Sequence, residues 1–148
     1  MLLKCMPTPR PKPDKPSAAR AAMMRAVKAY DTAPERIVRA LLRDIAPGYR
    51  LQRRGLPGRP DIVYGNRRIA IFVHGCFWHG HSCPRGAREP KTNADYWRGK
   101  IAANRARDAR NLAALDGLGW HALIVWECEL KDSAAVSARL RAALAPDE

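Results

Sequence analysis

Residues 74–83, with the sequence His-Gly-Cys-Phe-Trp-His-Gly-His-Ser-Cys, concentrate the groups of this chain that could do chemistry. The segment holds three of the four histidines and two of the four cysteines. Thiolate sulfur and imidazole nitrogen are the ligands that zinc prefers. Phe77 and Trp78 stand beside these groups in a glycine-containing loop, where burial of both rings is not expected. The segment therefore predicts a metal site with a spare histidine and two exposed aromatic side chains.

A fourth zinc ligand must come from outside this segment. Cys76 and Cys83 are separated by six residues, with His79 and His81 between them. Cys128 is the only other thiol beyond the N-terminal arm, and it ends an expected strand, where a short side chain can face the loop. Three cysteines and one histidine make a closed, structural zinc site. Spacing does not decide which histidine binds, and the other one could transfer protons near neutral pH. Cys128 has an alternative role as a small buried apolar residue.

The segment Leu56-Pro-Gly-Arg-Pro-Asp61 places one carboxylate directly before an expected strand. Pro60 is expected to hold Arg59 in an extended conformation and so to fix the direction from which Asp61 enters. A carboxylate in this position can hold a hard cation such as Mg²⁺. The pattern is weak on its own, because Asp commonly begins strands that follow turns.

The elements that must position these groups follow from the apolar pattern. Thr32-Ala-Pro-Glu35 matches a capping box and predicts a helix that ends near Ala46-Pro47-Gly48. Strands over 61–64 and 68–73 are expected to form an antiparallel hairpin, joined by the two-residue turn Gly65-Asn66. A helix over 94–116, a central strand over 120–126 and a helix over 133–144 complete the chain. This order predicts an α/β sandwich around a mixed sheet.

The length of 148 residues suits a single domain. Residues 1–16 alternate prolines with basic residues and predict an extended, disordered arm, in which Cys5 is left free. Residues 17–30 follow as a helix that is basic on one side. The expected single domain spans residues 17–148.

The charge of the chain indicates its partner. The 27 Lys and Arg residues against 14 Asp and Glu residues give a formal net charge of +13, and phosphate neutralisation makes nucleic acid the partner that explains it. An anionic membrane is disfavoured, because the sequence shows no basic amphipathic helix with a broad aromatic face. The sequence also shows no signal peptide or membrane span, so we expect a cytoplasmic protein, where clustered Cys and His favour metal over disulfides.

Together these segments resemble the very short patch repair endonucleases, bacterial enzymes that nick DNA at mismatches. The resemblance covers roughly residues 17–130 and keeps the family's order and spacing. The segment Gly-Cys-Phe-Trp-His, followed later by Val-Trp-Glu-Cys, is highly specific. The matching segments are Asp31–Glu35, Leu56–Val63, Ile71–Cys83, Tyr96-Trp97, Lys100-Ile101 with Asn104 and Arg107-Asp108, and Gly119-Trp120 with Val125–Leu130.

The resemblance implies a restriction-endonuclease-like, three-layer core with a central mixed sheet, a structural zinc ion and a catalytic magnesium ion. The implied zinc ligands are Cys76, His81, Cys83 and Cys128. The implied catalytic positions are Asp61 as magnesium ligand, His79 as general base, and His74 and Glu35 beside them. Val73 is expected to bind magnesium through its backbone carbonyl; some relatives carry a hydroxyl or another polar residue nearby, so turnover would suffer if a side chain helped. Glu35 is also explained locally by the capping box.

The DNA contacts implied by the resemblance come from the same loop and from two helices. Phe77 and Trp78 match aromatic residues that wedge into the duplex beside the mismatch, where a base step is easiest to open. Met24 matches a residue that enters from the other groove. Arg25, Lys100 and Arg105 are expected to contact phosphates.

The expected function is therefore magnesium-dependent nicking of one DNA strand at T:G mismatches that arise from deaminated 5-methylcytosine. The expected partners are mismatched double-stranded DNA and, functionally, a 5-methylcytosine methyltransferase and mismatch-repair proteins. The enzyme is expected to act as a monomer on the bacterial nucleoid. Two alternatives remain open: a zinc-stabilised DNA-binding protein without activity, and a nuclease of the same fold that acts on another lesion or in restriction.

Overall fold

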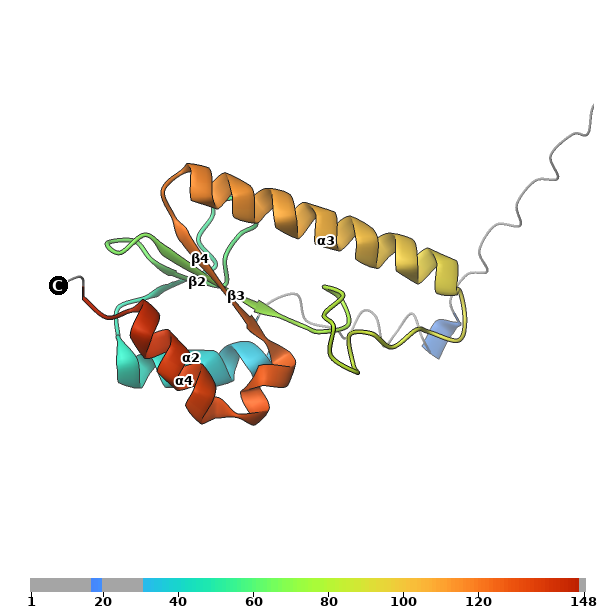
Figure 1. The fold of residues 1–148 in the computed structure, drawn as a ribbon, viewed down its shortest axis with the longest axis horizontal. Coiled ribbons are helices and arrows are strands. Elements are labelled where there is room, and N and C mark those ends of the chain that lie inside the picture. The colour runs from blue at the N-terminus through green and yellow to red at the C-terminus, as the bar shows by residue number, and fades with distance from the viewer. Residues whose placement is uncertain (1–16, 20–30, 147–148) are drawn as a thin grey trace, which may run out of the picture.

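The structure, a computed structural model, describes residues 17–19 and 31–146 (Figure 1). The N-terminal arm at 1–16 with Cys5, and most of the helix expected over 17–30 with Met24 and Arg25, lie outside the described residues. In chain order the elements are α2 (Ala33–Ile45), β1 (Arg50–Leu51), β2 (Ile62–Tyr64), β3 (Ile69–His74), α3 (Ala94–Gly117), β4 (His121–Trp126), the 3₁₀ helix η1 (Glu127–Lys131) and α4 (Ser133–Ala143).

The sheet is mixed, as the sequence predicts, with the strand order β1-β2-β3-β4. β1, β2 and β3 pair antiparallel, and β3 pairs parallel with β4 over six residues, from Ile69↔His121 to His74↔Trp126. The prediction that residues 120–126 form a central strand is wrong, because β4 lies at the edge of the described sheet. The residues of β4 are apolar because helices cover both faces of the strand. A strand covered on both faces is apolar whether it lies at the centre or at the edge of a sheet.

The β2–β3 hairpin is confirmed, but the expected two-residue turn is not. Tyr64 pairs with Ile69, so the loop has the four residues Gly65–Arg68. The Arg68 amide donates to the Gly65 carbonyl at 3.3 Å, and Arg68 itself has a φ of +51°. The chain therefore turns through a hydrogen-bonded four-residue loop that leaves Arg67 and Arg68 exposed.

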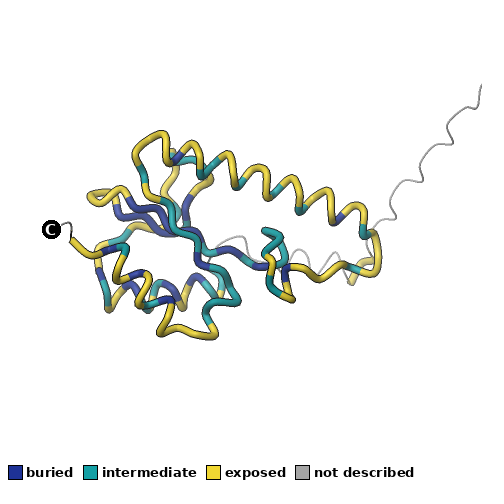
Figure 2. Tube along the Cα trace, viewed as in Figure 1, coloured by how far each residue is buried: buried dark blue, intermediate teal, exposed yellow. Residues whose placement is uncertain are grey.

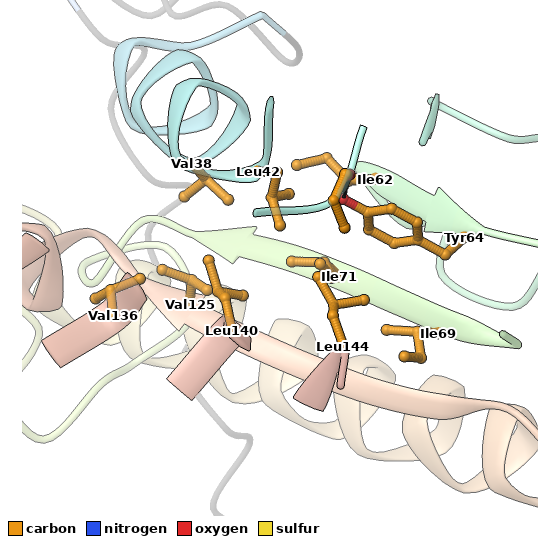
Figure 3. Packing of buried hydrophobic residues seen from close by; sticks show 11 residues of the cluster. Val38, Leu42, Ile62, Tyr64, Ile69, Ile71, Val125, Val136, Leu140 and Leu144 are labelled. Atoms are coloured by element: carbon orange, nitrogen blue, oxygen red, sulfur yellow. Dashed lines mark hydrogen bonds between the residues drawn. The ribbon is translucent and has the colours of Figure 1, made fainter. Parts of the chain in front are cut away.

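Two apolar clusters pack on opposite faces of the sheet. Alternate residues of β3 divide between them, because successive side chains of a strand point to opposite faces. Ile69 and Ile71 pack with α2 and α4 (Figure 3). Ala70 and Phe72 pack with Leu115 of α3, which covers the other face (Figure 1). Figure 2 shows the buried residues concentrated in β2 and β3 and on the inner sides of α2 and α4. Helices thus cover both faces of the sheet.

Helix α2 begins as the sequence predicts. Thr32 is the N-cap, its hydroxyl accepts from the Glu35 amide at 3.4 Å, and Pro34 lies in the first turn. The reciprocal bond of the capping box is shifted by one residue, because the Glu35 carboxylate accepts from the Asp31 amide at 2.9 Å. The ends of α2 and α4 are therefore fixed by local polar groups, since Asp132 likewise caps α4 through the Ala135 amide.

Helix α3 confirms the helix expected over 94–116 and extends well past the sheet (Figure 1). Its N-terminal half reaches the loop that follows β3, where the side-chain amide of Asn104 donates to the Trp78 carbonyl at 2.9 Å. Helix η1, which the sequence analysis missed, turns the chain after β4 and carries Cys128. No helix in the described part of the chain combines the length and apolar character needed to cross a bilayer.

Candidate active site and metal centre

The loop after β3 is folded back on itself by its own backbone. The His79 amide donates to the Gly75 carbonyl, and the His81 amide donates to the Cys76 carbonyl at 3.0 Å. Gly86 closes the loop at a point where a β-carbon would lie 2.1 Å from the His81 carbonyl oxygen. Only glycine fits there. The backbone contacts of the loop therefore bring residues 76–83 together without the help of a metal ion.

The four residues expected to bind zinc meet in one cluster. The ligand atoms of Cys76, His81, Cys83 and Cys128 all lie within 4.8 Å of one another, and the Cys128 sulfur is 3.4 Å from His81 Nδ1. Tetrahedral zinc with thiolate and imidazole ligands places those atoms about 3.5–3.8 Å apart. The residues present therefore fit zinc without rearrangement of the backbone.

Hydrogen bonds and stacking support this cluster. The Cys128 amide donates to the Cys76 sulfur and the Gly86 amide to the Cys83 sulfur, each at 3.4 Å. The His81 ring stacks on Trp126 with centroids 4.2 Å apart. In the metal-free protein, burial raises the pKa of the Cys76 thiol to about 12, whereas the Gly86 amide lowers the pKa of the Cys83 thiol to about 6. Metal binding requires both as thiolates, so it must release protons.

A cleft of about 660 Å³ lies beside the cluster and holds the other expected site residues. The ends of β3 and α2, the loop before β2 and the middle of α3 form its walls. Its acidic and imidazole side chains are Glu35, Asp61, His74, His79 and Asp108; its basic ones are Arg59, Lys100 and Arg107. Val73 and Trp78 also line it.

Asp61 enters this cleft from the start of β2. One carboxylate oxygen accepts from the Val73 amide at 2.8 Å, and the other accepts from the Gln52 side chain at 3.3 Å. Burial, and secondarily the nearby Glu35 carboxylate, raise the pKa of Asp61 to about 6, while the Val73 amide opposes the shift. A largely buried carboxylate whose ionised form is disfavoured gains from a cation, so Asp61, with the Val73 peptide beside it and Glu35 in the same cleft, fits a divalent metal.

The turn that delivers Asp61 differs from the sequence expectation. Arg59 has a φ of +50°, so Pro60 does not hold it in the ordinary extended region. The Arg59 amide instead donates to the Leu56 carbonyl at 3.2 Å and closes a turn with Gly58 at φ +77°. A β-carbon at Gly58 would lie 3.1 Å from Asn111 and from Phe72. The turn therefore packs directly on α3, and this tertiary contact outweighs the local preference of a residue before proline.

His74, at the end of β3, and His79, in the loop that follows, form a stacked pair. Their ring centroids are 3.7 Å apart and nearly parallel, and His79 Nδ1 lies 2.6 Å from an Asp108 carboxylate oxygen. Because a carboxylate only accepts, His79 Nδ1 carries the proton and Nε2 is left free to accept one. Burial lowers the pKa of His74 to about 4, and its Nδ1 is buried without a hydrogen-bond partner among the residues that the structure describes.

Asp108 is the site residue that the sequence analysis missed. The resemblance includes it in the matching Arg107-Asp108 pair but implies no role for it. The sequence does contain one indication of a role: Asp108 is the only acidic residue in the long basic stretch of α3 between Asp95 and Asp116. Its pairing with His79 depends on where α3 lies over the loop, which sequence spacing does not reveal.

Phe77 and Trp78 are half-buried, so the expectation of two exposed rings is wrong. Both pack edge-on or tilted against Trp97 of α3, with centroids 5.9 Å and 5.7 Å away. The Lys100 ammonium lies over the rings of Trp78 and Trp97. Arg105 covers Gly80, where a β-carbon would lie 2.7 Å from its Cδ. The aromatic tip of the loop is thus supported by the helix rather than projecting freely.

One solved structure has a similar fold. The fold is similar to the homing endonuclease I-Bth0305I catalytic domain, with a TM-score of 0.52, 21% identity, and coverage of 76% of this chain and 94% of that one. This likeness concerns the fold of a DNA-cleaving domain.

Sequence relatives define the family. Residues 14–85 match the family described as DNA mismatch endonuclease Vsr. The type II nicking enzyme V.XorIIP of Xanthomonas oryzae is 53% identical over 86% of this chain and 93% of its own length. The DNA mismatch endonuclease Vsr of Escherichia coli is 45% identical over 77% of this chain and 72% of its own. The chain belongs to the Vsr family of DNA endonucleases.

Proposed function

We propose that this protein nicks one strand of double-stranded DNA at T:G mismatches and so initiates very short patch repair. The observation that carries the proposal is the single cleft in which Asp61, Glu35, His74 and a His79–Asp108 pair meet beside a zinc-competent loop. The proposed architecture is the restriction-endonuclease-like, three-layer core, and the proposed setting is the bacterial cytoplasm, with the enzyme acting as a monomer on the nucleoid.

In this proposal Asp61 and the Val73 carbonyl hold magnesium, with Glu35 beside them. Such an ion would stabilise negative charge on the phosphate and the leaving oxygen. His79 takes a proton from the attacking water through Nε2, while Asp108 accepts from Nδ1 and stabilises the imidazolium. His74, kept neutral by burial, stacks on His79 and fixes the plane of its ring.

The zinc ligands Cys76, His81, Cys83 and Cys128 act on the loop and not on the phosphate. Zinc bound there would hold His79 and the aromatic tip at a fixed distance from Asp61. Phe77 and Trp78 are proposed to move from Trp97 into the duplex beside the mismatch, assisted by Met24 from the other groove. Lys100, Arg105 and Arg25 contact phosphates, which position the duplex without reading its sequence.

A nicking assay tests this proposal. Equal amounts of T:G and T:A duplex of otherwise identical sequence are incubated with and without magnesium, and the labelled strands are separated. We expect a nick in the thymine-containing strand of the T:G duplex only, and only with magnesium. Absence of cleavage on every duplex would indicate a DNA-binding protein without activity.

The similarity to a type II nicking enzyme supports a second candidate, a nuclease linked to a restriction system. The two candidates share the cleft and differ in the sequence around the mismatch. A panel of T:G duplexes with varied flanking bases separates them, since a restriction-linked enzyme cleaves only within the site that its companion methyltransferase modifies. The methyltransferase and the mismatch-repair proteins remain proposed functional partners in either case.

A further inference from the structure

Gln52 lies directly after β1 and opposite Asp61 on the neighbouring strand. β1 and β2 pair in the register Leu51↔Ile62, and the next pair in that register is Gln52 and Asp61. The Gln52 backbone amide donates to the Asp61 carbonyl at 3.1 Å, and its side-chain amide donates to Asp61 Oδ1 at 3.3 Å. Gln52 is half-buried and lines the cleft. It therefore contacts both the backbone and the carboxylate of the residue proposed to bind magnesium.

The backbone conformation of Gln52 is unfavourable for its residue type. Its φ of +47° lies in the left-handed region, which Gly and Asn occupy most readily and which costs other residues about 1–2 kcal/mol. The turn itself does not need the Gln52 side chain. The backbone bond to Asp61 holds the chain on one side, and the Arg53 guanidinium over the Trp120 ring holds it on the other. The side chain therefore has its role in the cleft.

The two donors that hold the Asp61 carboxylate are both uncharged. Oδ2 accepts from the Val73 backbone amide, and Oδ1 accepts from the Gln52 side chain. In the described part of the chain, no ion pair includes Asp61. Each carboxylate oxygen has two lone pairs, so each keeps one for a further ligand. The carboxylate is thus held in one orientation without being paired with a Lys or Arg.

We propose that Gln52 is a positioning residue of the metal site, whose side-chain amide fixes the orientation of the Asp61 carboxylate and so raises its affinity for a divalent cation. Loss of a hydrogen-bond partner behind a metal ligand typically lowers metal affinity by about 10–100-fold. An amide suits this role better than a basic side chain, which would itself pair with the carboxylate and compete with the cation. The inference rests on the proposed function, because it takes Asp61 as a ligand of the catalytic metal.

The first test compares nicking by the full-length Gln52→Met and Gln52→Gly variants with nicking by the wild type. Methionine keeps the length of the side chain and removes the donor. Glycine removes the side chain and favours the positive φ, so this variant keeps the turn. In both variants we expect the magnesium concentration for half-maximal nicking to rise about tenfold. The kcat at saturating magnesium, and the affinity for the duplex in magnesium-free buffer, should stay close to those of the wild type.

A second readout, without catalysis, separates this inference from the proposed function. Mn²⁺ replaces magnesium, and the electron paramagnetic resonance signal of the free ion measures its binding to zinc-loaded protein without DNA. We expect Asp61→Ala and both Gln52 variants to bind Mn²⁺ about tenfold or more weakly than the wild type. If only Asp61→Ala weakens binding, the inference is wrong and the proposed metal site stands. If Asp61→Ala binds Mn²⁺ normally, the proposed metal site and the inference both fail.

Asn93→Gly is the matched control. Asn93 also has an uncharged amide and a positive φ, +55°, and it begins α3 without a side-chain hydrogen bond to the helix. It is not among the residues that line the cleft. The variant should keep the wild-type dependence on magnesium and the wild-type affinity for Mn²⁺. Equal weakening in Asn93→Gly would overturn the inference, as would weakening in Gln52→Gly without weakening in Gln52→Met, because the donor would then have no part in the effect.

Discussion

The four-residue cluster proposed to bind zinc and the cleft proposed to be catalytic share one loop, but the cluster is closed to a substrate and the cleft is open. In the cluster, four ligand atoms gather within 4.8 Å, are supported by backbone amides and leave no position for a substrate. In the cleft, Asp61 contributes one carboxylate and a neighbouring peptide to an open cavity. A closed site can only hold the protein together, whereas an open one can bind and change another molecule. His79 lies between the two, on the loop that carries three of the cluster's ligands and in the cleft where the reaction is proposed to occur.

The strongest test of this division is Asp61→Ala. Loss of the only carboxylate at the start of β2 should reduce nicking by about 10³-fold or more, since metal-assisted stabilisation supplies several kcal/mol. Zinc content, measured by atomic absorption, and affinity for the mismatched duplex should remain those of the wild type. Normal nicking by this variant would place the reaction elsewhere.

His79→Ala should have the next largest effect. Removal of a general base typically costs about 10²–10⁴-fold in rate, and the loss should appear in kcat rather than in DNA affinity. Asp108→Asn should cause a smaller loss, because His79 remains but its proton is no longer fixed on Nδ1.

The double variant His79→Ala/Asp108→Asn tests whether the two residues act together or independently. It should be no slower than His79→Ala alone, since Asp108 acts through the imidazole. Additive losses would mean that Asp108 has a role of its own.

Cys128→Ser should affect stability before chemistry. Cys128 is the ligand furthest in sequence from the others, so it joins η1 to the loop. A hundredfold weaker zinc site costs about 2.7 kcal/mol of linked stability when zinc is in excess. Zinc content and the thermal midpoint should both fall, and excess zinc should restore part of each. Unchanged zinc content would show that Cys128 is only a buried apolar residue.

The zinc loop and the cleft also differ in how far the sequence predicts them. Cys76, His81 and Cys83 are close in sequence, and glycines at fixed points fold them together, so local spacing is informative. Asp108 and the Arg59 turn depend instead on where α3 lies against the sheet. The edge position of β4 is a similar case, because burial on two faces and a central place in the sheet give the same apolar sequence. Sequence therefore predicts contacts within an element or a tight loop better than contacts between layers.

The smallest expected effect concerns the electrostatics of the open site in protein that is loaded with zinc but free of magnesium. The folded state raises the pKa of Asp61 to about 6, above the unfolded value of about 3.9, so the native state binds more protons between those values. Stability of the wild type should then fall as pH rises from about 4 to 6 and level off above that range. Asp61→Asn does not titrate but keeps an acceptor for the Val73 amide.

At each pH we take the free energy of unfolding of Asp61→Asn minus that of the wild type. This difference should be about 2 kcal/mol larger at pH 8 than at pH 4. Urea denaturation at the two pH values measures this, with Asp44→Asn as an exposed control that shows no comparable gain. Added magnesium should remove this gain of the variant at pH 8, because the ion is expected to stabilise only the wild type. If the stability of the variant relative to wild type is lower at pH 8 than at pH 4, the Asp61 carboxylate is stabilised by its surroundings without a cation. The cleft would then be a closed, structural site like the zinc cluster, and the contrast between them would disappear.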